Sequence, residues 1–219
     1  MKRTLAAVAI LTLTSSSAFA FGLSSLSGSG SSPAGLSADQ IQAQFGSLSK
    51  EYNLATKSFM LSASTALAAF DAKTSSERLK SEADQLGTGT VSSDDVERHT
   101  ALLKSAKSEV TAKLKSGEKL SEAGKAKFVQ SMVHLGKGVA TEGPLVATVA
   151  SLSKSTADSM KSISFTQIGK VKATASALTT LSSSLPQDMG LAKDTMGLYV
   201  DYAKTNRIDV PKDVTDLFK

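Results

Sequence analysis

The residues able to do acid–base or metal chemistry are few in this chain. It has two histidines, His99 and His134, and no cysteine. Asp94, Asp95 and Glu97 lie near His99, but acids directly after a serine are also typical of a helix N-terminus. Structural zinc sites need three or four nitrogen or sulfur ligands in most cases, and no stretch here supplies them locally. We therefore predict no metal site, and Glu97, His99 and His134 are the one acid–base combination to test.

Serine and lysine with the spacing Ser-x-x-Lys place a nucleophile beside a base on one helical turn in penicillin-interacting enzymes. The chain contains three such pairs: Ser47/Lys50, Ser116/Lys119 and Ser151/Lys154. Both residue types are common here, and the companion motifs Ser-Asp-Asn and Lys-Thr-Gly are absent from the sequence. Gly136-Lys137-Gly138 follows no strand, which a phosphate-binding loop requires, so close helix packing or a helix break explains it better. We predict no catalytic or cofactor-binding residue, and we expect no enzyme.

One long amphipathic helix is predicted from Ile41 to Phe70. Apolar residues recur in it every three or four positions, with a period near 3.6: Ile41, Phe45, Leu48, Tyr52, Ala55, Phe59, Ala63, Ala66 and Phe70. Three leucines widen this stripe on one flank: Leu54, Leu61 and Leu67. Ser37 and Gln40 have capping-box spacing at its start. Because the outer face carries few charges, burial of the stripe should provide the stability of the helix.

The apolar pattern weakens around 71–76 and resumes at Leu79, so the helix either continues to Leu86 or breaks briefly near 73–76, and we favour a continuous or kinked helix. Further helices are predicted at about 92–116, 120–142, 144–160, 164–185 and 188–205. Breaks are expected at Pro144 and Pro186, because proline disrupts a helix interior. No stretch shows the sustained alternation of a strand. The sequence therefore predicts an all-α fold, an elongated antiparallel bundle of about five to six helices with a disordered N-terminal segment.

The N-terminus has the features of a secretory signal peptide. Lys2 and Arg3 precede the apolar stretch 5–13, and Ala18-Phe19-Ala20 resembles a signal peptidase site. We predict a signal peptide over 1–20 that is cleaved after Ala20, which indicates a periplasmic or secreted bacterial protein. A flexible linker rich in glycine and serine follows over 21–36, then one helical-bundle domain over 37–205 and a C-terminal tail over 206–219.

Charge and composition narrow the classes of function. The net charge is +5, and the lysines are spread along the predicted helices, so nucleic acid is not an expected partner. No transmembrane segment is expected in the mature chain. We expect an exported, non-catalytic helical bundle that binds a protein or envelope partner, with no cofactor. The alternative is a carrier of a lipid or other apolar ligand held between helices, which would require a hollow interior.

Overall fold

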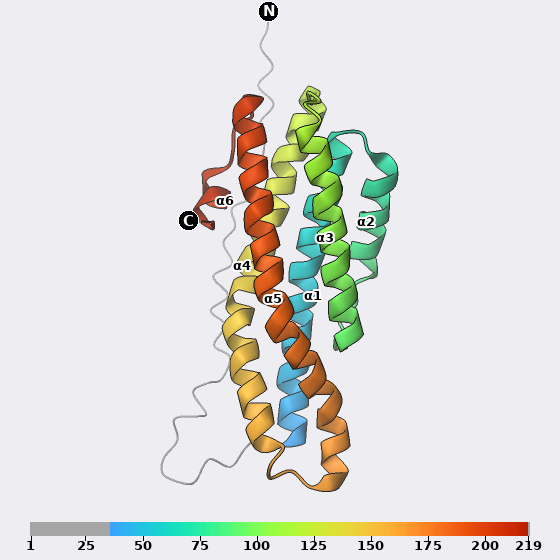
Figure 1. Cartoon of the computed structure of the whole chain (residues 1–219), viewed down its shortest axis with the longest axis vertical. Helices are drawn as coiled ribbons and strands as arrows, with labels where there is room; N and C mark the ends of the chain where they lie inside the picture. The colour runs from blue at the N-terminus through green and yellow to red at the C-terminus, as the bar shows by residue number, and fades with distance from the viewer. Residues whose placement is uncertain (1–35, 219) are drawn as a thin grey trace, which may run out of the picture. The chain divides into compact units, whose positions relative to one another are not determined.

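The computed structural model describes residues 36–218, except for the side chains of Phe165, Thr166 and Lys170. All regular structure in this range is helical, which confirms the all-α prediction (Figure 1). The helices are α1 (Ala38–Ala69), α2 (Lys73–Gln85), α3 (Ser93–Lys115), α4 (Glu122–Ser159), α5 (Phe165–Thr205) and α6 (Lys212–Asp216). The predicted signal peptide and all but the last residue of the predicted linker lie outside the described residues.

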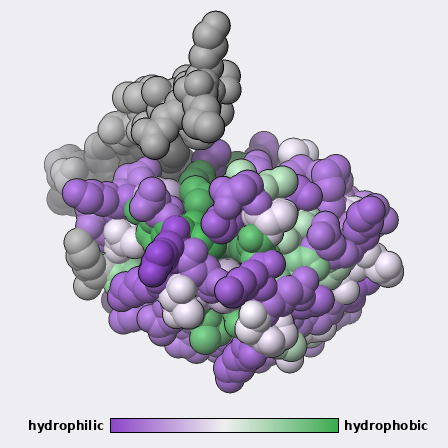
Figure 2. Space-filling view, turned by 90° about the horizontal axis from the view of Figure 1, so that it is seen from above, coloured by the Kyte–Doolittle hydropathy of each residue, from purple (hydrophilic) through white to green (hydrophobic). Residues whose placement is uncertain are grey.

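Helix α1 is the central element of the bundle. Its capping box is present: the Ser37 hydroxyl accepts from the Gln40 backbone N–H, and the Gln40 side chain accepts from the Ser37 N–H. All nine residues of the predicted stripe are buried. The helix contacts α2, α3, α4 and α5. Seen down the bundle from the end where α5 terminates, hydrophobic residues lie towards the centre and hydrophilic residues around the rim (Figure 2).

The expectation of a continuous helix up to Leu86 is wrong. Helix α1 ends at Ala69, and Asp71 adopts a left-handed conformation with φ of 54° that reverses the chain. Helix α2 then packs against α1, and the Ser64 hydroxyl donates to the Ser76 carbonyl at 2.8 Å. The reversal lets Leu79 and Ala83 of α2 join the core beneath α1, whereas a straight extension would leave them in water.

The expected breaks at Pro144 and Pro186 are also wrong, because α4 and α5 run through both prolines. Each proline lies at an exposed position of its helix. The carbonyls of Ala140 and Ser182, which lose their helical donors, also belong to exposed residues, so water can satisfy them. Two long helices therefore replace four of the predicted shorter ones, and α5 changes direction along its length (Figure 1).

The C-terminal residues pack on the bundle through α6. Val214 and Ile208 are buried in the main apolar cluster. A Cβ added to Gly136 of α4 would meet the Val214 side chain at 3.2 Å, so glycine permits this close approach. Within the predicted tail the structure has one helix, the five-residue α6.

Candidate functional site

A layer of buried polar side chains separates the two largest of the three apolar clusters in the core. One cluster includes Phe59, Leu103, Val139 and Ala192, and the other includes Tyr52, Val96, Leu145 and Leu185. Each long helix passes from one cluster to the other across buried polar residues: Asn53 and Thr56 on α1, His99 and Thr100 on α3, Glu142 on α4, and Asp188 on α5. We call these six residues the polar layer. Because four helices contribute to it, the layer is a property of the assembled bundle.

Glu142 is the most isolated group of the polar layer. Its side chain is 1% exposed, and neither carboxyl oxygen has a hydrogen-bond partner among the described residues. Burial, and then the charge of Asp188, raises the pKa of Glu142 to about 9. The side chain is therefore a neutral acid at neutral pH.

Asp188 is the second buried acid, with 2% of its surface exposed. Its Oδ2 accepts a hydrogen bond from the Thr100 hydroxyl at 3.4 Å, and its Oδ1 has no partner among the described residues. Burial raises its pKa to about 7, although Thr100 and Lys104 act in the opposite direction. The Lys104 ammonium donates to Gln187 at 3.1 Å. Near neutral pH this acid is poised between its two protonation states.

The rings of Tyr52 and His99 stack on each other, with ring centroids 5.9 Å apart and an interplanar angle of 27°. The Tyr52 hydroxyl has no partner that meets hydrogen-bond geometry. Burial and then the charge of Asp188 raise its pKa, against a smaller lowering by the Thr56 hydroxyl. Burial, and then the Arg98 charge, lowers the pKa of His99 to about 4. At neutral pH the imidazole of the layer is therefore neutral, and so is the phenol of Tyr52 that stacks on it.

The structure does not assemble the acid–base combination considered from the sequence. His99 is buried against Tyr52, whereas Glu97 is exposed on the same helix. His134 is half-buried on α4, two turns or about 12 Å of helix rise from Glu142. Burial and the charge of Lys137 lower the pKa of His134.

The acids near His99 have a structural role at the start of α3. Asp95 accepts hydrogen bonds from the Ser92 N–H and hydroxyl, which lower its pKa and cap the helix. Asp94 is exposed in the same first turn. Within residues 36–218, the structure has no group of three or more histidines and acids able to hold a metal ion.

The Ser-x-x-Lys pairs lie at the surface. Ser47 is partly exposed, and the other five residues of the three pairs are exposed. Ser116 and Lys119 lie in the connection between α3 and α4, so they do not share a helical turn. In Gly136-Lys137-Gly138, close packing is confirmed at Gly138, where an added Cβ would overlap the Phe59 ring.

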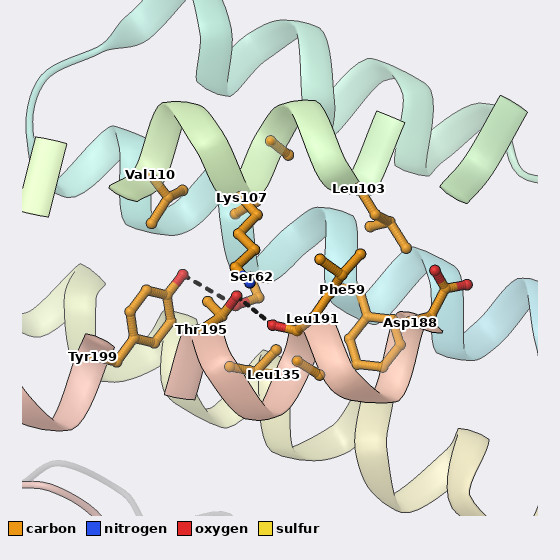
Figure 3. Close-up of a pocket in the computed structure, with 13 residues that line it drawn as sticks. Phe59, Ser62, Leu103, Lys107, Val110, Leu135, Asp188, Leu191, Thr195 and Tyr199 are labelled. Carbon is orange, nitrogen blue, oxygen red and sulfur yellow. Dashed lines mark hydrogen bonds between the residues drawn. The ribbon is translucent and has the colours of Figure 1, made fainter. Parts of the chain in front are cut away.

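A small pocket lies beside the polar layer, between α1, α3, α4 and α5 (Figure 3). Its volume is about 40 Å³, and most of its lining is apolar, including Phe59, Leu103 and Leu135. Asp188 lies at one end of it, and the hydrogen-bonded pair Ser62 and Tyr199 lies at the other (Figure 3). A water needs roughly 10–15 Å³ of such space, whereas pockets for larger ligands measure about 300–1,000 Å³. This pocket has room for a few waters and is too small for an acyl chain.

Glu142 and Asp188 were not among the residues singled out from the sequence. Each occupies an apolar-stripe position: Glu142 lies between Val139 and Leu145, and Asp188 between Leu185 and Ala192. Because a helix break is expected at each neighbouring proline, the predicted apolar stripe ends beside each acid, and the position of the acid within the stripe is missed. An acid that falls on the apolar stripe of a helix continued through the proline is the sequence pattern that indicates such a residue.

Between Leu54 and Ala68, helix α1 has a line of uncharged residues that are exposed or partly exposed. Of the three flanking leucines, Leu67 is buried and Leu61 is partly buried, whereas Leu54 is 54% exposed. We define the α1 strip as the residues along this line: Leu54, Ser58, Leu61, Thr65 and Ala68. It is flanked by the Lys57–Asp84 ion pair, which joins α1 to α2, and by Lys127 of α4, which donates to the Ala68 carbonyl.

Comparison of the chain with protein-family models, curated proteins and solved structures finds no match. Among the described helices, none combines the length and apolar character needed to cross a membrane. The fold and site thus define a class of protein: an all-α bundle with α1 at its centre and a buried polar layer across its core.

Proposed function

We propose that this chain is an exported, non-catalytic helical bundle that binds a protein partner through the α1 strip. The observation that supports this proposal is Leu54. It is the most exposed large apolar side chain among the described residues, and it lies on the helix that is otherwise the most enclosed. Complete burial of an exposed leucine contributes about 1.5–3 kcal/mol, so a partner that covers Leu54, which is 54% exposed, gains roughly half of this energy.

The surroundings of the α1 strip favour a protein over other partners. Its five residues carry no charge, and charged groups lie on either side, at Lys57 and Asp84 on one side and Lys127 on the other. An uncharged centre with a polar rim is the usual anatomy of a protein–protein interface. Export rests on the predicted signal peptide, which would bring the strip to partners in the periplasm or outside the cell.

The alternative function, a carrier of a lipid or other apolar ligand, would require the helices to separate, because the pocket measures about 40 Å³. Native mass spectrometry of protein purified without detergent distinguishes the two functions. We expect the mass of the polypeptide alone, and a co-purified lipid would favour the carrier.

Site-specific photo-crosslinking in the exporting cell tests the proposed interface. A photo-reactive residue at position 54 should give a discrete adduct with another protein. Position 217 is the matched control, because Leu217 is similarly exposed, at 48%, but lies outside the strip. Leu61→Lys should lower the adduct yield about tenfold or more, as expected for a charge at the centre of an interface. No adduct at position 54, or the same adduct at position 217, would contradict the proposal.

A further inference from the structure

The two buried acids, two prolines and the pocket all lie where the polar layer divides the core. We propose that the layer is a proton-controlled hinge. With Glu142 and Asp188 protonated the bundle is closed, and loss of their protons opens α4 and α5 at Pro144 and Pro186 and admits water. This device is independent of the proposed partner binding.

Neither acid forms an ion pair among the described residues. The titratable and charged groups beside them are Tyr52 from α1, Lys104 and Lys107 from α3, and each acid facing the other from α4 and α5, while His99 of α3 stacks on Tyr52 and is neutral at neutral pH. Lys107 forms an ion pair with Asp194 at 2.7 Å, and Lys104 donates to the neutral Gln187 and acts on Asp188 through its charge alone. An ionised Glu142 is therefore buried without a partner, and an ionised Asp188 keeps one hydrogen bond, from Thr100, so loss of either proton disfavours the closed bundle.

Helices α4 and α5 are weakest beside these acids. Pro144 follows Glu142 by two residues, and Pro186 precedes Asp188 by two. Each proline removes the hydrogen bond that the carbonyl four residues earlier would accept, so each helix bends most easily at this level. The packing also changes here, because the apolar clusters on either side are separate. Opening at the layer can therefore leave both clusters intact.

The pocket beside Asp188 offers a route for water. Asp188 lines the pocket between α3 and α5, and its Oδ1 has no partner. The Lys107–Asp194 ion pair spans the same two helices and is largely exposed on the Asp194 side. An exposed pair of this kind contributes little to stability, so it does not hold the seam closed. Water can thus reach Asp188 first.

The sign of the pH effect follows from burial. In the unfolded chain both acids lose their protons near pH 4, because the reference pKa is about 3.9 for Asp and about 4.3 for Glu. In the folded state both acids keep their protons to higher pH. The contribution of these two acids to stability is therefore full below about pH 4 and falls as the pH rises, up to about pH 7 for Asp188 and up to about pH 9 for Glu142. Each such group raises the unfolding constant by up to about tenfold per pH unit.

Hydrogen–deuterium exchange of the full chain at about pH 6 and pH 8.5 tests the hinge. After correction for the intrinsic rate, exchange in 139–146 and 182–192 should rise about tenfold or more at the higher pH. The α1–α2 hairpin, which lacks buried acids among its described residues, should change much less. The variant Glu142→Gln/Asp188→Asn should show no such rise, and Asp201→Asn, an exposed acid on α5, should behave like the wild type.

Three results would overturn the hinge. The first is unchanged exchange in the wild type, the second an equal rise in the double variant, and the third a rise spread evenly over all helices. If the double variant does not fold, Asp188→Asn alone decides the question. Its neutral side chain should remove the part of the pH effect that ends near pH 7 and leave the part that continues to about pH 9.

Discussion

His99 and the buried acids give opposite contributions to the pH dependence of stability. His99 is 2% exposed, and its pKa is about 4 in the folded bundle against about 6.5 in an unfolded chain. The unfolded state therefore binds the extra proton first, and this contribution to stability is lost as the pH falls from about 6.5 to 4.

His99→Gln should remove this loss of unfolding free energy at acidic pH, which amounts to at most about 1.4 kcal/mol per pH unit. Urea unfolding at about pH 6.5 and pH 4.5 measures it, and imidazole NMR shifts give the pKa of His99 directly. A His99 that titrates near 6.5 would contradict the buried, Tyr52-stacked ring.

Gly138 is a second residue whose identity follows from one contact. An added Cβ would overlap the Phe59 ring, so Gly138→Ala should destabilise the bundle by about 1–3 kcal/mol. Gly190→Ala is the matched control, because nothing lies within 4 Å of its added Cβ on α5. That change should stabilise by about 0.5–1 kcal/mol through helix propensity. Urea unfolding compares the two, and equal effects would show that Gly138 is not a packing glycine.

The residues of the polar layer were the hardest part to predict from the sequence. His99 was singled out for its chemistry, but its stacking on Tyr52 depends on how α1 and α3 pack. Asp188 follows a proline, and a start-of-helix acid explains that position equally well until α5 is known to be continuous. The sequence shows which residues are acidic, but tertiary packing decides which of these acids are buried away from water.

At the scale of helices, the prolines are the distinctive feature. Pro144→Ala and Pro186→Ala each restore a backbone N–H for an unpaired carbonyl and remove a helix-disfavouring residue. Each change should stabilise the bundle by up to about 3 kcal/mol in urea unfolding. Pro211→Ala, at the N-cap of α6, is the control and should have little effect because no helix interior is involved.

The proline variants also test the hinge. Pro144→Ala should reduce the pH-dependent rise in exchange around Glu142, because the restored hydrogen bond resists bending there. Destabilisation by either helix-interior proline variant would show instead that the prolines fit a strained backbone.

Helix type and the inward face were predictable from local pattern, whereas helix ends were less so. The stripe and capping box of α1 depend on residues within a few turns, and both are present. The reversal at Asp71 and the continuity of α4 and α5 depend on what each segment packs against. Packing against α1 stabilises a continuous α4 by more than Pro144 costs locally. This packing energy comes from residues far away in the sequence, so a short stretch around Pro144 does not reveal it.

At the scale of the whole molecule, export is the prediction that sets the protein's surroundings. When the gene product is made in a bacterial host, we expect the mature chain to begin at Phe21. Intact-mass measurement of the periplasmic fraction checks this, with a variant carrying a charge in the apolar stretch 5–13 as the control. A full-length chain retained in the cytoplasm would contradict export, and with it the proposed envelope setting of the α1 strip.

Two acids across the core of the bundle keep their protons far above the pH at which a free carboxyl loses them. Carboxyl carbon NMR of the labelled protein, assigned with Glu142→Gln and Asp188→Asn, measures this most directly. At about pH 7 we expect Glu142 to remain protonated and Asp188 to be partly ionised, whereas a carboxyl with a reference pKa near 4 is fully ionised at this pH. Titration of both Glu142 and Asp188 near pH 4 would contradict the account, because it would place both side chains in water or beside a cation.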